Sequence, residues 1–249
     1  MHNIYTTSGF VIGSSLYGEA DKMLFVFTRD FGLVNVIAKG IRLGKSKLRF
    51  CVQDYSLGIY SLVRGRDIWR LTDARELVSS SADKLPSPKE RSLIVSVAPV
   101  AGGDPPVAER LSRIRRMAEE RNEGISSRRG GSDRHINATN DLVFGLIVRI
   151  ALLLRRFLHG EEKHEELFDC ILKFMEFCMI NKISEKKIDV LESLIVARIL
   201  YLLGYIGDQK GLNEYLKSIE INDELLNLLQ DKRIVLNREI NKALSESHL

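Results

Sequence analysis

Positively charged side chains are concentrated in one short stretch near the start of the chain. Residues 39–49 carry five of them, interspersed with the small residues Gly40, Gly44 and Ser46: these are Lys39, Arg42, Lys45, Lys47 and Arg49. Small residues let the backbone approach a phosphate closely, and each phosphate neutralised by a cation releases condensed counterions. We therefore predict that this stretch follows a sugar–phosphate backbone.

Four more arginines extend this pattern over the first 75 residues: Arg29, Arg64, Arg66 and Arg70. In total, residues 1–75 hold eleven Lys and Arg against six Asp and Glu, whereas residues 140–249 hold fifteen against eighteen. Such an asymmetry indicates a half that binds a polyanion and a half that is structural or binds partners. A basic surface that is merely solvated is the alternative.

Aromatic residues are interleaved with these cations and could stack on nucleic-acid bases. The candidate stacking residues are Tyr17, Phe31, Phe50, Tyr60 and Trp69. Each of them also fits a hydrophobic core, and the core interpretation is favoured at any single position.

No residue pattern predicts catalysis or a metal site. An acidic cluster contains two histidines, but their spacing of five does not place both on one face of a helix; its members are His159, Glu161, Glu162, His164, Glu165 and Glu166. Glutamate is favoured in the first turn of a helix, so a solvated helix start explains the cluster better. The chain has neither a Walker-type phosphate loop nor a nucleophile elbow. We expect no enzyme activity and no cofactor.

Three cysteines, Cys51, Cys170 and Cys178, lack the spacing of a disulfide framework. They indicate reduced thiols in a cytosolic protein.

The chain opens without a signal-peptide pattern, and arginines interrupt its most apolar run, 142–158, making that run a poor membrane span. We therefore expect a cytoplasmic, nucleoid-associated protein with no membrane partner.

The basic stretch lies among segments of strand composition. Apolar, β-prone runs cover residues 8–16, 22–28, 33–38, 55–63 and 67–77, and turn residues separate them. Five short strands within about 75 residues are typical of the oligonucleotide/oligosaccharide-binding fold, the OB-fold. We predict an OB-fold nucleic-acid-binding domain over residues 1–80.

The rest of the chain differs in composition. All five prolines lie between Pro86 and Pro106, so residues 81–140 are predicted to be a linker or insertion with one short Arg-rich helix from about Asp104 to Glu123 and a flexible stretch over 128–139. Beyond Asp141 there is no proline, and helical spacing predicts an α-helical domain over 141–249. Its helices are expected at 141–158, 161–180, 185–203, 212–219 and 222–245. The predicted fold class is α+β with two domains.

Several motifs in the first domain resemble the RecO family of bacterial recombinational repair mediators. The matching pieces are the segments 7–12 (Thr-Ser-Gly-Phe-Val-Ile), 18–24 (Gly-Glu-Ala-Asp-Lys-Met-Leu), 27–32 (Phe-Thr-Arg-Asp-Phe-Gly), 38–42 (Ala-Lys-Gly-Ile-Arg) and 45–47 (Lys-Ser-Lys). The segments 166–168 and 200–205 are similar to the family's helical domain. The resemblance covers residues 1–80 well and 141–210 loosely.

The resemblance implies an N-terminal OB-fold followed by a helical domain, without catalysis. It implies binding of single- and double-stranded DNA and annealing of complementary strands coated with single-strand-binding protein (SSB). It also implies partnership with RecR and with the C-terminal tail of SSB, and help in loading RecA. Many family members carry a four-cysteine zinc motif after the Leu-Gly-Tyr segment. Residues 206–211 hold no cysteine, so we predict no zinc.

An SSB tail is acidic and ends in an apolar residue with a free carboxylate, so its capture requires an apolar pocket rimmed by cations. Arg198 is the first candidate because apolar residues surround it in the sequence and a bound carboxylate would satisfy it. Arg155 and Arg156 are second candidates, although a cation at the end of a helix is also favoured by the helix dipole.

Two other functions fit the same residues. An RNA-binding OB-fold protein of translation or ribosome association needs the same cationic groove. A protein–protein adaptor needs none, and it would be favoured if the cations of residues 39–49 lay on different faces of the barrel.

Overall fold

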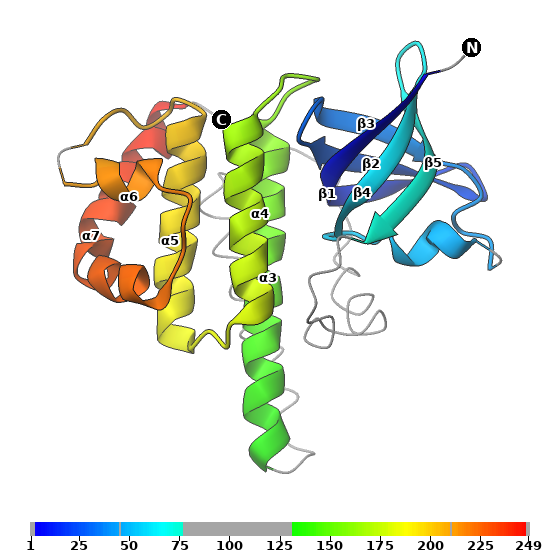
Figure 1. The fold of residues 1–249 in the computed structure, drawn as a ribbon. Coiled ribbons are helices and arrows are strands. Elements are labelled where there is room, and N and C mark those ends of the chain that lie inside the picture. The colour runs from blue at the N-terminus through cyan, green and yellow to red at the C-terminus, as the bar shows by residue number, and fades with distance from the viewer. Residues whose placement is uncertain (1–2, 45, 77–130, 210, 248–249) are drawn as a thin grey trace. The chain divides into compact units, whose positions relative to one another are not determined.

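The computed structural model describes residues 3–44, 46–76, 131–209 and 211–247 (Figure 1). Lys45, the prolines and the predicted Arg-rich helix lie outside these residues. The chain divides into two compact units: the first comprises Met1–Ala82 and Ile150–Leu172, and the second comprises Asp83–Arg149 and Lys173–Leu249. Residues 150–157 at the end of α3 and the first half of α4 thus belong with the barrel.

Five strands form the first unit's sheet: β1 (Ile4–Tyr17), β2 (Asp21–Thr28), β3 (Gly32–Ala38), β4 (Leu57–Arg64) and β5 (Trp69–Glu76). The sheet closes into a barrel in the order β1-β2-β3-β5-β4. All neighbouring pairs are antiparallel except β3 and β5, which pair in parallel. Five strands closed in this order form an OB-fold barrel, which confirms the predicted fold.

Strand alternation places one side chain in two inside the barrel. The buried core comprises Val11, Leu24, Val26, Val34, Val36, Ala38, Ile41, Val52, Tyr60, Leu62, Trp69 and Ala74. The run from Met23 to Phe27 is apolar at every position because both faces of β2 are covered. Leu24 and Val26 point into the barrel, whereas Phe27 packs against Phe168 with ring centroids 5.6 Å apart.

The helices are α3 (Gly131–Phe157), α4 (Glu165–Ile180), α5 (Glu185–Leu202), α6 (Asn213–Lys217) and α7 (Asp223–Glu246). Helix α3 begins at Gly131 rather than near Asp141, so residues 131–139 are helical and not the flexible stretch expected. Helix α4 begins at Glu165 rather than Glu161, and the residues before it connect α3 to α4. The helical half of the predicted fold is confirmed.

In the second unit, α5 is the central helix. Its residues are buried almost continuously from Ile188 to Leu200, and α6 and α7 both pack against it. Polar pairs fix how the neighbouring helices align with α5. The Ser193 hydroxyl donates to Asn237 Oδ1 of α7 (2.8 Å), and Arg149 of α3 forms a bidentate pair with Glu192 (2.6 and 2.7 Å). Among the described residues, no helix is both long and apolar enough to cross a membrane.

Candidate nucleic-acid interface

The connection between β3 and β4, residues 39–56, builds the basic surface. Ile41 and Val52 are buried in the barrel core, and Leu48 and Cys51 pack against it, so the connection is anchored to the barrel at four residues. Tight turns fold the chain between these anchors, and residues Lys47–Phe50 form a short 3-10 helix, η1. Apolar anchors alternate with charged residues, which forces the charged side chains outward.

Hydrogen bonds tie the start of this connection to the turn between β1 and β2. The Gly40 N–H donates to Asp21 Oδ1 (2.7 Å), and the Arg42 N–H donates to the Ala20 carbonyl (3.0 Å). The Arg42 guanidinium also donates to the carbonyl of Glu19 (2.7 Å). These carbonyl partners orient the guanidinium without neutralising its charge.

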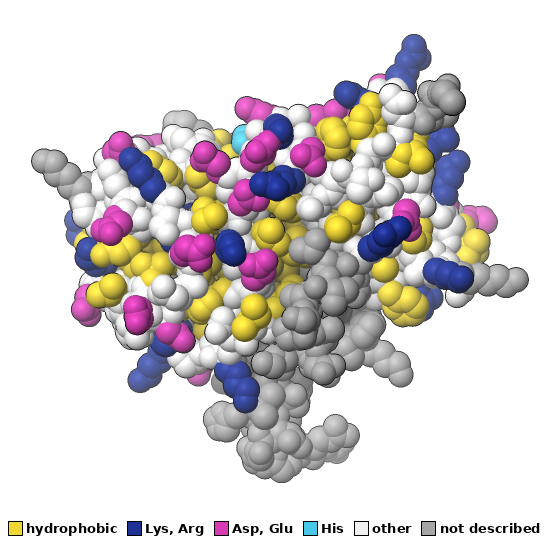
Figure 2. Space-filling view, in the orientation of Figure 1, with side chains coloured by type: hydrophobic (Ala, Val, Ile, Leu, Met, Phe, Trp, Pro, Cys, Tyr) yellow, Lys and Arg dark blue, Asp and Glu magenta, His cyan; other side chains and the backbone are white. Residues whose placement is uncertain are grey.

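Four of the five cations predicted in this stretch are exposed on that one connection: Lys39, Arg42, Lys47 and Arg49. The fifth, Lys45, lies outside the described residues. No ion pair within 4.0 Å involves any of the four in the described part of the chain. Figure 2 shows cationic and hydrophobic side chains exposed together over the barrel.

The other four predicted cations are also exposed, and two of them, Arg66 and Arg70, make no ion pair within 4.0 Å in the described residues. Arg70 lies on the outer face of β5, where the parallel register pairs it with Ile37 of β3. Lys39 follows Ile37 by two residues, or about 7 Å along a strand, so Arg70 extends the basic surface across the sheet. Arg66 lies in the turn between β4 and β5, farther from the connection in sequence.

The five aromatic candidates divide into two groups. Tyr60 and Trp69 are buried core residues, and Phe31 packs against Trp69 with ring centroids 5.0 Å apart. In contrast, Tyr17 and Phe50 are 45% and 50% exposed. Phe50 lies in the basic connection, and Tyr17 ends β1, next to the turn whose carbonyls accept from Arg42. The Arg49 guanidinium lies 5.4 Å from the centroid of the Phe50 ring. Only Tyr17 and Phe50 therefore present a ring face that a base could reach.

Arg29 and Arg64 have acidic partners in the segment that connects α3 to α4 and begins α4. Arg29 pairs with Asp169 (2.9 Å), and Arg64 pairs with Glu161 (2.9 Å). The Trp69 indole N–H donates to the other oxygen of Glu161 (2.8 Å). Glu161, a member of the acidic cluster at residues 161–166, therefore contacts the barrel and does not belong to a solvated helix start.

Arg198 occupies a different environment from the one expected. Its side chain is fully buried, and its guanidinium donates to the backbone carbonyls of Tyr215 (2.9 Å) and Glu220 (3.1 Å). The sequence shows only its apolar neighbours on α5, not the two carbonyls that follow 17 and 22 residues later. Two backbone carbonyls thus accept from donors that the sequence analysis assigned to a bound carboxylate, and the assignment of Arg198 to an acidic tail stays a prediction.

Arg155 and Arg156 lie near the end of α3, and Arg155 is exposed. The Arg155 guanidinium stacks on the Phe25 ring, 4.2 Å from its centroid. Leu152 lies three residues before Arg155 and four before Arg156, and it is 38% exposed. An apolar side chain and two cations therefore share one helix face.

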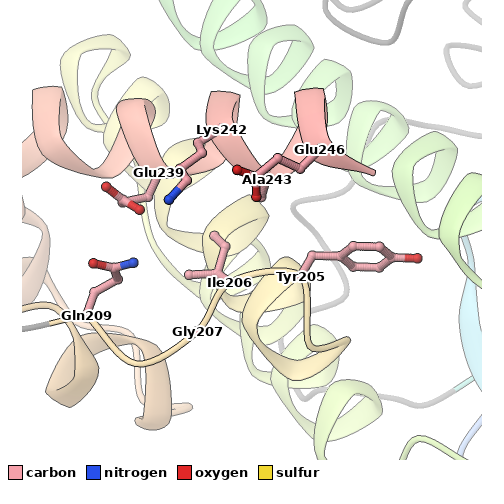
Figure 3. Close-up of a pocket in the computed structure, with 8 residues that line it drawn as sticks. All are labelled: Tyr205, Ile206, Gly207, Gln209, Glu239, Lys242, Ala243 and Glu246. Carbon is pink, nitrogen blue, oxygen red and sulfur yellow. The ribbon is translucent and has the colours of Figure 1, made fainter. Parts of the chain in front are cut away.

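Metal ligands do not converge anywhere in the described part of the chain. Burial raises the pKa of the Cys178 thiol, which keeps that thiol neutral and a poor ligand. A small pocket of about 80 Å3 lies where residues 205–209 meet α7 (Figure 3). Glu239, Lys242 and Glu246 project from α7 toward it. Its volume is far below the roughly 300–1,000 Å3 of small-molecule sites.

Comparison with known proteins matches the barrel to one family. Residues 1–80 fit the profile of the family described as Recombination protein O N terminal. Residues 1–80 are therefore similar to the N-terminal domain of RecO proteins. The DNA repair protein RecO of Rubrobacter xylanophilus is 41% identical over 76 residues, which cover 30% of this chain and 31% of that protein. RecO of Alkaliphilus metalliredigens is 41% identical over 73 residues, covering 28% and 30%.

The similarity extends to more distant relatives, such as RecO of Synechocystis, which is 31% identical over 74 residues, covering 30% of this chain and 27% of that protein. The match thus spans about a third of the length of these RecO proteins. The family profile, over residues 1–80, includes the basic connection and the strands that position it.

Proposed function

We propose that this chain is a RecO-type DNA repair and recombination mediator, without enzymatic activity. It binds single- and double-stranded DNA, anneals complementary strands coated with SSB and, with RecR, assists RecA loading. The observation that carries the DNA-binding part is the set of exposed cations on the β3–β4 connection of a RecO N-terminal barrel: Lys39, Arg42, Lys47 and Arg49. The partners follow from the similarity to RecO proteins.

The exposed rings favour a role for single strands. Phe50 contacts Arg49, and Tyr17 precedes the turn that Arg42 contacts. Stacking on an aromatic face requires a base that is not held inside a duplex. Phosphate contacts through lysine and arginine also serve duplex DNA. The same surface therefore supports both DNA forms, as an annealing protein needs.

The similarity also suggests a site for the acidic SSB tail. Leu152 offers an exposed apolar side chain, and the guanidinium of Arg155 or Arg156 would take the terminal carboxylate. Their spacing on one turn of α3 matches a terminal apolar residue whose carboxylate lies a few ångströms from its side chain.

An annealing assay tests the proposed function. Complementary DNA strands are coated with SSB, and the appearance of duplex is followed by fluorescence with and without the full chain. We expect the chain to accelerate annealing of coated strands. No acceleration, together with tighter binding to RNA than to DNA of the same sequence, would favour the RNA-binding alternative.

Titration with an acidic peptide that ends in an apolar residue tests the tail site. We expect Arg155→Ala combined with Arg156→Ala to weaken peptide binding about tenfold or more, as loss of a charge-assisted pair does, and to leave DNA binding unchanged. A peptide with an amidated C-terminus serves as the control. Equal loss of both bindings would indicate a structural role for the arginines.

A further inference from the structure

Glu161 lies between two groups of the barrel. One carboxylate oxygen accepts from the Arg64 guanidinium (2.9 Å), and the other accepts from the Trp69 indole N–H (2.8 Å). The Arg64 guanidinium also lies 5.6 Å from the centroid of the Trp69 ring. Both carboxylate oxygens are therefore used, and the charge of Arg64 is balanced inside the protein.

A second acidic residue of the same segment pairs with the turn between β2 and β3. Asp169, in the first turns of α4, accepts from the Arg29 guanidinium (2.9 Å). Arg29 and Arg64 are two of the nine cations that the sequence assigns to the nucleic-acid surface. In the described part of the barrel they differ in this respect from Lys39, Arg42, Lys47 and Arg49, which make no ion pair.

The position of Glu161 is fixed by the backbone on either side of it. The Leu33 N–H donates to the Gly160 carbonyl (3.1 Å). Gly32 has a φ of 66°, and a Cβ there would overlap the backbone of Glu162. This close approach, together with the Trp69 hydrogen bond, holds the carboxylate against the barrel. Arg64 is the more exposed member of the pair, with 60% of its side chain exposed against 40% for Glu161.

We propose that Glu161 and Asp169 act as internal phosphate mimics, which block nucleic acid from this part of the barrel and confine it to the basic connection. This inference rests on the proposed nucleic-acid binding. A phosphate near Arg64 must either displace a carboxylate that Trp69 and the backbone hold, or accept repulsion from it. Arg29 and Arg64 thus contribute little to binding despite their charge and exposure.

The other charged groups near this segment form no ion pair with Arg29 or Arg64 in the described residues. Lys163 pairs with Glu165, and Asp30 accepts a hydrogen bond from the Thr7 hydroxyl (2.6 Å). Glu162 is strongly exposed and lies 3.9 Å from His164. Glu161 and Asp169 are the acids of this segment that meet a barrel arginine in the described residues.

Glu161→Gln is the decisive variant, because the amide oxygen can still accept from Trp69 while the negative charge is lost. Binding of a fluorescent single-stranded oligonucleotide to the full chain is measured by anisotropy at several salt concentrations. We expect binding about three- to tenfold tighter than wild type and a salt slope steeper by about 0.7, which is one more single-strand phosphate contact. Glu166→Gln, which removes the same charge from an exposed position nearby, is the matched control and should change affinity less than twofold.

Arg64→Ala, alone and combined with Glu161→Gln, completes a double-mutant cycle for this pair. In the wild-type background it should weaken binding less than about threefold, through the Glu161 charge that it leaves unpaired, whereas in the Glu161→Gln background it should remove the gain. Strong loss from Arg64→Ala alone, or no gain from Glu161→Gln while Lys39→Ala still weakens binding, would overturn the inference and leave the proposed function standing. If the wild-type chain bound no oligonucleotide, the proposed function would fail, and the inference with it.

Discussion

A single buried guanidinium holds the segment between α6 and α7 in the helical unit. Arg198 donates to the carbonyls of Tyr215 and Glu220, which belong to the end of α6 and the residues after it. Replacing Arg198 by Met keeps much of the volume but leaves buried acceptors without donors. We expect a loss of about 2–4 kcal/mol of unfolding free energy, measured by urea denaturation.

Arg238→Met, at an exposed position on α7, is the control and should change stability by less than about 0.5 kcal/mol. If Arg198→Met instead kept full stability and lost only the binding of an acidic peptide, the result would favour Arg198 as a tail-binding residue over a structural role.

Tyr55 links the stability of the barrel unit to alkaline pH. Burial, reinforced by the Asp54 carboxylate and opposed by Arg155, raises the pKa of Tyr55 from 10.0 to about 12. The folded state therefore keeps the phenol protonated while the unfolded state ionises, so stability is complete below pH 10 and falls between pH 10 and 12. We expect wild type to lose about 1–3 kcal/mol more than Tyr55→Phe across this window, in urea titrations at each pH. Parallel pH profiles for the two proteins would contradict the assignment.

At the scale of elements, the segment that connects α3 to α4 behaves as a part of the barrel. Gly32 and Gly18 both adopt positive φ, at 66° and 64°, but only Gly32 faces another backbone within 4 Å. Gly18→Ala should therefore cost only the backbone penalty of about 1–2 kcal/mol. Gly32→Ala must also displace residues 160–162, and we expect a loss of at least about 3 kcal/mol. Thermal unfolding of the two variants measures the difference, and equal losses would mean that the segment moves away easily.

The strands could be predicted from sequence because alternation, β-branched residues and turn glycines all agree locally. The Met23–Phe27 run shows where local pattern stops being informative: it predicts a buried strand, but not that residues 155 and 168 cover its outer face. Contacts between residues far apart in the chain produce no periodic pattern in the sequence. Trp69 and Glu161 are 92 residues apart, and Arg29 and Asp169 are 140 residues apart. The basic connection was found because all its cations lie close together in the sequence.

At the scale of the whole molecule, charge is distributed unevenly between the parts of the chain. Residues 1–75 carry a net charge of +5, and residues 140–249 carry −3. Two of the barrel's cations are balanced by acids that lie far along the sequence, so net charge overstates the surface that is open to a polyanion. We expect the helical half to repel nucleic acid at low salt and to leave the basic connection as the main contact.

The salt dependence of duplex DNA binding tests the central claim most directly. A variant with Lys39, Arg42, Lys47 and Arg49 replaced by Ala is compared with wild type and with a control in which Lys182, Lys186, Arg238 and Lys242, exposed cations of the helical unit, are replaced by Ala. We predict a slope of log affinity against log salt that is shallower by about three to four in the first variant and little changed in the control. An unchanged slope in the first variant, or the same flattening in the control, would contradict the assignment of DNA binding to the basic connection.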